Sequence, residues 1–419
     1  MAVVRDLRVL LRFRDFRRLL TVRLLSQGAD GVYQVGLATY VVFSPEKQAS
    51  ATAIASAMAV LLLPYSLVGP FAGVLLDRWR RRQVLVHGNL LRAAMATVTA
   101  VLIVGRVPDW LFYLSALCVT GINRFVLAGL SAALPRVVDE ERLVIANSLT
   151  PTAGTLAATA GGGLAFAVRL LAAESDTAVV LLGAALYLCS ALASLRMAPE
   201  LLGPDAPARE PLARTLRGTA RGLAAGVRHL AAPRRREAAW ALGAMTLMRF
   251  CYGALTVLVL MLCRYAWSSG VDRGLALLGL AVAFSGAGFF AAAVVTPAGA
   301  GRLGPGRWIA VCAGIGALLE PALGLPFAAG PGFVAAFFLG FVTQGAKIAT
   351  DTVVQSTVDD AFRGRIFSLY DVLFNAAFVG AAGVAAALLP PDGRSSALVV
   401  GVAVLYGTIA LSLARFEAR

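Results

Sequence analysis

Apolar stretches of about 20 residues recur along the whole chain and are separated by short polar segments. A helix needs roughly 20 apolar residues to cross the hydrocarbon core of a bilayer, so each stretch predicts a transmembrane helix. The pattern predicts an all-α membrane protein with twelve transmembrane helices in two pseudo-symmetric six-helix bundles. The stretches fall near residues 17–43, 52–76, 83–105, 109–133, 145–170, 177–197, 237–265, 274–297, 308–325, 327–354, 366–389 and 397–416.

The predicted domains follow from these boundaries. Residues 17–197 form an N-terminal six-helix bundle, and residues 237–419 form a C-terminal one. The segment between them, 198–236, is polar and rich in proline and arginine, and we interpret it as a central loop. Residues 1–16 alternate arginine with leucine and valine, which predicts a short basic amphipathic helix at the membrane surface.

Composition supports a membrane protein and excludes several other classes. Hydrophobic residues make up 59% of the 419 residues and charged residues only 15%, whereas soluble domains have about 45–50% and 25%. The mean hydropathy is +0.77. A water-soluble enzyme, a disordered protein and a secreted disulfide scaffold are therefore excluded. The five cysteines all lie in apolar stretches without a CxxC motif, which favours neither disulfides nor a metal site.

The basic residues predict the orientation of the chain. Most of the 38 lysines and arginines fall in the segments that share a side with the two termini, including 77–82 and 198–236. By the positive-inside rule, both termini and the central loop are cytoplasmic. The net charge of +15 then faces anionic lipid of the inner leaflet, so no nucleic-acid partner is needed to explain it.

Polar residues inside the predicted spans mark candidate functional positions. The first span carries Gln27, Asp30 and Gln34 on one helical face, with Asp30 near the bilayer midplane. Ionisable side chains within a membrane are costly and usually functional. Every third helix is therefore predicted to line an aqueous substrate cavity, and the carboxylates on it are candidates for binding protons. The matching positions on the fourth, seventh and tenth spans are Asn123, Arg124, Arg249, Tyr252, Gln344, Lys347 and Asp351.

These charges also have a structural interpretation, and both remain open at this stage. Lys347 and Asp351 are four residues apart on one helix and can form a permanent ion pair. Asp30 has three candidate partners: Arg124 and Arg249 across the cavity, or Arg92 behind it. A closed pair with Arg92 would make Asp30 a structural residue. Two acidic residues, Glu320 and Asp371, lie off the pattern of every third helix.

The segment after the second span carries a sequence signature. Residues 73–82 read GVLLDRWRRR and resemble the G-x-L-a-D-r-x-G-r-k motif of the major facilitator superfamily, with Arg80 in place of the second glycine. A degenerate copy without the acidic residue occurs at 301–307. The resemblance implies that Asp77 contacts the start of the eleventh predicted span, 366–389. This contact would close the inner side of the transporter. The matching motif residues are Gly73, Asp77, Arg78, Arg81 and Arg82.

Three further segments resemble the twelve-helix efflux branch of that superfamily, which includes enterobactin-exporter and macrolide-efflux-like proteins. They are residues 14–31, residues 134–149 and residues 363–369. In the last of these, Arg363, Gly364 and Arg365 are expected in a loop of the C-terminal half. The fifth span lacks the Gly-Pro pair of the antiporter signature, so its small residues, such as Gly154 and Gly161, favour close packing against a neighbouring helix.

The motifs together predict a transporter. Neither His87 nor His229 lies near an acid or cysteine cluster, and no phosphate-binding G-x-x-x-x-G-K-[ST] run is present. We therefore expect no enzymatic activity and no cofactor. The interpretation we favour is export of a small amphipathic molecule by a monomer in the plasma membrane, in exchange for protons. The alternatives are an importer or uniporter, and a non-transporting sensor or partner subunit built on a transporter scaffold.

Overall fold

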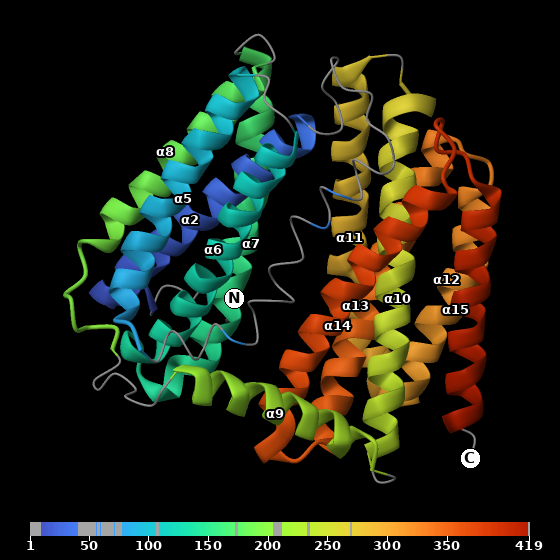
Figure 1. Cartoon of the computed structure of the whole chain (residues 1–419). Helices are drawn as coiled ribbons and strands as arrows, with labels where there is room; N and C mark the ends of the chain where they lie inside the picture. Colours follow the sequence, from blue (N-terminus) through green and yellow to red (C-terminus); the bar gives the residue numbers. More distant parts are fainter. Residues whose placement is uncertain are drawn as a thin grey trace. The chain divides into compact units, whose positions relative to one another are not determined.

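The computed structural model describes residues 10–40, 56, 59, 71, 78–105, 109–171, 175–203, 212–232, 235–268 and 270–417. Within these ranges every regular element is helical (Figure 1). The described residues fall into two compact units, which meet in the chain between Gly218 and Thr219. This confirms the predicted all-α class.

The described part of the first unit contains five long helices. The helix α2 packs on both α7 and α8, and α5 packs on both α6 and α8. Figure 1 shows α2, α5 and α8 running side by side. The bounds are α2 Arg14–Ala38, α5 Arg81–Val104, α6 Asp109–Ala133, α7 Glu140–Leu171 and α8 Asp176–Ser194.

The described part of the second unit contains six long helices after α9. In it α11 packs on α13, α12 packs on both α13 and α15, and α10 packs on α14. A five-residue π-helical turn, Leu262–Ala266, extends α10. The bounds are α10 Arg236–Met261, α11 Val271–Leu303, α12 Pro305–Gly324, α13 Ala329–Thr357, α14 Asp360–Leu388 and α15 Ser396–Glu417.

The helices agree with the predicted spans. Ten helices of the described chain are long and apolar enough to cross a membrane. The first predicted span, 17–43, corresponds to α2, which begins three residues earlier at Arg14 and is not one of these ten helices. The second predicted span, 52–76, lies outside the described residues except for three isolated positions.

One helix was not predicted. The helix α9, Leu212–Leu230, lies within the segment that the sequence analysis interpreted as a loop. Its apolar residues at 212, 216, 223, 227 and 230 recur at helical spacing between arginines, which makes it amphipathic. Its C-terminal part packs on the start of α14, where the His229 ring stacks on Phe362 with centroids 4.3 Å apart.

Glycines let α2 and α7 touch through their backbones. A Cβ atom added at Gly31 would lie 1.9 Å from the carbonyl oxygen of Ala158, and one added at Gly161 would lie 2.1 Å from that of Gly28. Only glycine fits at such distances. This confirms that the small residues of the fifth predicted span serve close helix packing.

The described start of the chain belongs to the core of the first unit. Leu10 is 1% exposed and packs in one cluster with Phe16 and Leu19 of α2 and with Val126 and Leu130 of α6. The prediction of a surface helix over 1–16 is therefore wrong for Leu10, because this side chain is buried among helices. Residues 1–9 lie outside the described part.

Candidate functional site: charged residues inside the two units

A buried ion pair lies inside the first unit. Arg92 Nη1 on α5 is 2.7 Å from Asp30 Oδ1 on α2. The Arg92 side chain is completely buried, and that of Asp30 is 9% exposed. A buried charge is tolerated when it is paired and hydrogen-bonded. The charges of Arg92 and Asp30 therefore compensate each other.

Four more polar residues surround this pair. Arg92 donates hydrogen bonds to Asn123 Oδ1 at 2.8 Å, to Asn89 Oδ1 at 2.5 Å and to Ser26 Oγ. The Tyr187 hydroxyl on α8 donates to the carboxylate at 2.8 Å, and its ring centroid lies 4.3 Å from the guanidinium carbon. Four helices, α2, α5, α6 and α8, thus meet at one polar network.

The network identifies the partner of Asp30 within the first unit. Among the cations considered from the sequence, Arg92 is the one that forms this pair. A pair that stays closed ties α2 to α5. A pair that opens frees a carboxylate to bind a proton. The role of Asp30 in proton coupling remains a prediction.

The remaining predicted polar positions of this unit have different surroundings. Gln27 accepts a hydrogen bond from Arg23 Nε at 2.9 Å and lies against α7 at Gly154. Gln34 is exposed, although Asp30 one turn before it is buried, and Arg124 on α6 is half-buried. The predicted polar face of the first span is therefore not one continuous lining. Gln27 packs against α7, Asp30 belongs to the buried network, and Gln34 is exposed.

The second unit holds an ion pair on α13. Lys347 Nζ lies 2.9 Å from Asp351 Oδ2, and the two side chains are 38% and 28% exposed. This pair is the one that their four-residue spacing indicates. Gln344, one turn before Lys347, is half-buried, and the Tyr370 ring of α14 lies 5.8 Å from Lys347 Nζ.

Arg249 on α10 lies among aromatic rings. Its guanidinium carbon is 4.9 Å from the ring centroid of Tyr252, 4.2 Å from that of Phe374 and 4.5 Å from that of Phe378. No carboxylate of the described residues forms an ion pair with Arg249, and cation–π contacts of this kind stabilise its charge. Its buried Nε has no hydrogen-bond partner among the described residues, so this edge can donate to an acceptor on a bound molecule.

The signature after the second span is described only in part. Gly73 and Asp77 lie outside the described residues, and Arg78 precedes α5. Arg81 and Arg82 are the first two residues of α5, so the end of the signature belongs to a helix and not to the segment between two spans.

The two arginines that begin α5 bind carbonyl groups of the first unit. Arg81 Nη1 donates to Ala132 O at 2.9 Å and to Leu202 O at 3.2 Å, and Arg82 Nη2 donates to Leu195 O at 3.1 Å. Helix ends leave such carbonyls without intrahelical donors. These arginines therefore cap the ends of α6 and α8.

The predicted loop at 363–365 is helical. Arg363, Gly364 and Arg365 belong to the first two turns of α14, which begins at Asp360. Expecting a loop was therefore wrong. The Arg365 guanidinium carbon lies 5.2 Å from the ring centroid of Phe362, and its side chain packs against Gly222 of α9.

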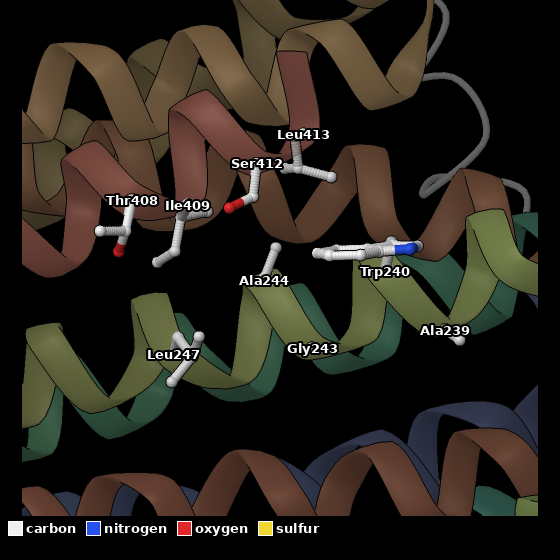
Figure 2. A pocket seen from close by; sticks show the side chains of 9 residues that line it. All are labelled: Ala239, Trp240, Gly243, Ala244, Leu247, Thr408, Ile409, Ser412 and Leu413. Carbon is white, nitrogen blue, oxygen red and sulfur yellow. The ribbon is translucent and has the colours of Figure 1, made fainter. Parts of the chain in front are cut away.

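A groove of about 300 Å³ lies between α10 and α15, outside the charged sites. Figure 2 shows Trp240 and Leu247 of α10 opposite Ile409 and Leu413 of α15. No charged side chain lines it, and Trp240 and Leu247 are each 45% exposed. Such an apolar surface suits contact with hydrocarbon.

Comparison with known proteins places the chain in a family. The sequence profile of the Major Facilitator Superfamily matches residues 20–384. This chain belongs to that superfamily. An uncharacterized MFS-type transporter of Mycobacterium tuberculosis (strain ATCC 25618 / H37Rv) is 38% identical over 400 residues, which is 94% of this chain and 89% of the relative. The protein is therefore a multi-pass membrane transporter of this superfamily and not an enzyme.

Two further kinds of similarity are more limited. Macrolide efflux protein A of Streptococcus pyogenes is 32% identical over 99 residues, 23% of this chain and 24% of the relative. Among solved structures, the nucleoside transporter NupG aligns with a TM-score of 0.69 at 15% identity, over 96% of this chain and 98% of its own. The peptide transporter POT gives 0.72 at 13%, over 96% and 94%. These structures confirm the fold.

Sequence reasoning predicted Tyr252 but missed the other aromatic members of the two sites, Tyr187, Phe374 and Phe378. Tyr187 is a single tyrosine in an apolar helix, and Phe374 and Phe378 are apolar residues in an apolar span. The spacing of the two phenylalanines, one turn apart, places them on one face of a helix. Nothing in the sequence indicates that this face meets Arg249.

Proposed function

We propose that this protein exports a small amphipathic organic molecule across the plasma membrane, as a monomer, by alternating access and in exchange for protons. The observation that carries the proposal is the presence of ionisable groups inside the spans of each unit. Such groups are costly in a membrane and mark substrate and proton paths. In both units they are held on helices by specific contacts.

The proposed substrate class follows from the surroundings of these groups. Arg249 offers a hydrogen-bond donor within a cluster of rings formed by Tyr252, Phe374 and Phe378. A molecule with a polar acceptor group and an apolar body can satisfy both features. The half-buried pair Lys347–Asp351 adds charges that can exchange partners with a bound molecule or a proton.

One observation supports the outward direction of transport, and another supports the orientation of the chain. The 99-residue similarity to a macrolide efflux protein gives one precedent for the outward direction. Arginines dominate the segments at 77–82 and 198–236, which supports an orientation with both termini in the cytoplasm. This orientation makes everted vesicles the natural preparation for measuring export.

The test uses everted membrane vesicles and proteoliposomes that contain the purified protein. We expect an imposed proton gradient, acidic inside, to drive accumulation of erythromycin or of a fluorescent amphipathic dye, and addition of the substrate to release protons. Matched vesicles without the protein are the control. Uptake that only equilibrates the substrate and does not depend on the proton gradient would indicate a uniporter. Accumulation only in right-side-out vesicles would indicate an importer. Absence of transport for a broad panel of amphipathic compounds would favour a sensor.

A further inference from the structure

Glu320 is a buried acidic residue that none of the sites above includes. It lies on α12, one turn before the end of that helix at Gly324, and it is 3% exposed. It faces a cavity of about 30 Å³, which is enough for a water molecule. The residues lining this cavity are Leu255, Leu258, Val259, Leu262, Trp267, Glu320, Leu323, Gly324, Phe327, Ala328, Gly332, Ala335, Ala336, Leu339 and Val399.

Among the described residues, none forms an ion pair with this carboxyl group. Its Oε1 atom has no hydrogen-bond partner among the described residues, and Glu320 is the only ionisable residue that lines the cavity. Gly316 and Gly324 lie one turn before and one turn after Glu320, on the same face of α12. The helix α15 packs on this face: a Cβ atom at Gly316 would lie 3.1 Å from the Tyr406 ring, and one at Gly324 would lie 3.4 Å from Val399.

The titratable neighbours are neutral groups. From the helices packed on α12, Cys251 of α10 and Tyr406 of α15 interact electrostatically with Glu320. Arg249 lies six residues before the first α10 residue of the lining. Lys347 and its partner Asp351 lie at least eight residues past Leu339, the last α13 residue that lines the cavity. Eight residues correspond to a helix rise of about 12 Å. The fourth packed helix, α11, contributes no residue to the lining.

We propose that Glu320 is a proton-binding site of the C-terminal unit: it holds a proton while its cavity is sealed and exchanges it with water that enters from the α12–α13 end. An ionised carboxylate without a cation or donor is strongly disfavoured in an apolar interior, so the sealed site stabilises the neutral acid. Hydration of the cavity stabilises the anion. Use of this site in a transport cycle rests on the proton exchange proposed above.

The side chain of Trp267 seals the cavity at its α12–α13 end. The Trp267 indole Nε1 donates to Phe327 O at 2.8 Å, and the indole ring covers Gly332, where a Cβ atom would lie only 2.5 Å from it. Phe327, between α12 and α13, has a φ of +49°, a strained conformation for a residue other than glycine. The indole thus contacts both this connection and the start of α13.

The first test detects the neutral carboxyl group directly by infrared difference spectroscopy of the full-length protein in lipid. The wild type should show the carbonyl stretch of a protonated carboxyl group at pH 7, and Glu320→Gln should lose it. Trp267→Ala opens the seal and should lose most of that band at pH 7 while keeping it in acid. Trp240→Ala, in the outer groove of Figure 2, should leave the band unchanged. A wild-type spectrum without the band would overturn the proposal.

A second test places the site in the cycle. Dicyclohexylcarbodiimide adds the O–H of a neutral carboxyl across its N=C bond, with the proton on nitrogen and no leaving group, so the labelled peptide gains the whole reagent mass. We expect this label on the Glu320 peptide of Trp267→Ala in acid and not at high pH. We also expect Glu320→Gln to transport without proton release. If no variant shows proton-driven transport, the proposed exchange fails while the infrared result still decides the site. Unchanged proton release by a folded Glu320→Gln variant would refute the role in the cycle.

Discussion

The ion pair between Asp30 and Arg92 gives the sharpest prediction for stability and function. Replacing Asp30 with asparagine leaves a completely buried guanidinium with neutral acceptors only. Breaking a buried pair by removing one partner costs about 3–5 kcal/mol. For a unit of about 150–250 residues, each kcal/mol lowers the melting temperature by about 2–4 °C, so we expect a loss of about 6–20 °C.

The measurement is thermal unfolding of purified variants in one detergent, followed by size-exclusion chromatography after heating. Asp351→Asn is the matched control, because its pair with Lys347 is 28–38% exposed and exposed pairs contribute about 0.2–1 kcal/mol. The double variant Asp30→Asn with Arg92→Gln should regain part of the loss, because the orphaned charge is gone. Equal melting temperatures for Asp30→Asn and the wild type would refute the energetic argument.

The same variant tests proton coupling. If the pair opens during transport, Asp30→Asn should bind substrate but lose transport driven by a pH gradient, while exchange of substrate for substrate persists. If the pair is permanent, the variant should fold poorly and the double variant should restore transport. Transport driven by pH in a well-folded Asp30→Asn protein would remove Asp30 from coupling and leave Asp351 and Glu320 as the candidates.

Three further predictions follow. Gly161→Ala should lower the melting temperature strongly, because the new Cβ atom would lie 2.1 Å from a backbone oxygen. The matched variant Gly163→Ala places its Cβ atom in open space and should be neutral or stabilising by up to about 1 kcal/mol. Equal effects of the two variants would contradict the close crossing of α2 and α7. Leu10→Ala should destabilise by about 2–5 kcal/mol, since Leu10 is 1% exposed, while Leu11→Ala, at 37% exposure, should change stability little; the two are compared by the same heating assay. Asp77→Asn should abolish most transport at normal expression, as the signature implies, and normal uptake into everted vesicles would count against a gate at this position.

The sequence predicted the helices well because their signal is averaged over about 20 residues. Each of the described spans begins within a few residues of its prediction. The helix α9 was not predicted, because its apolar residues, such as Leu216 and Leu223, lie in a segment whose arginines and prolines indicate a loop. Arg363, Gly364 and Arg365 were expected in a loop for a similar reason, since charged residues and glycine extend α14 beyond its apolar stretch.

The contacts of single side chains were harder to predict. Asp30 was recognised as important from its charge and depth, but its partner depends on which face of α5 meets α2, and the sequence left three cations possible. Tyr187 has no signal beyond being a tyrosine in an apolar helix. Pairing in a bundle depends on the rotation of each helix about its axis, which apolar spans do not encode individually.

The packing of α9 on α14 determines where the chain can be divided. Gly222 and His229 of α9 contact the first turns of α14, and Arg235 Nη2, which follows α9, is 2.5 Å from Asp359 Oδ1 just before α14. A C-terminal fragment for co-expression should therefore begin before Leu212, so that this helix is synthesised together with the segment it covers. A fragment that begins at Arg236 would expose the Phe362 ring and leave Asp359 without its arginine.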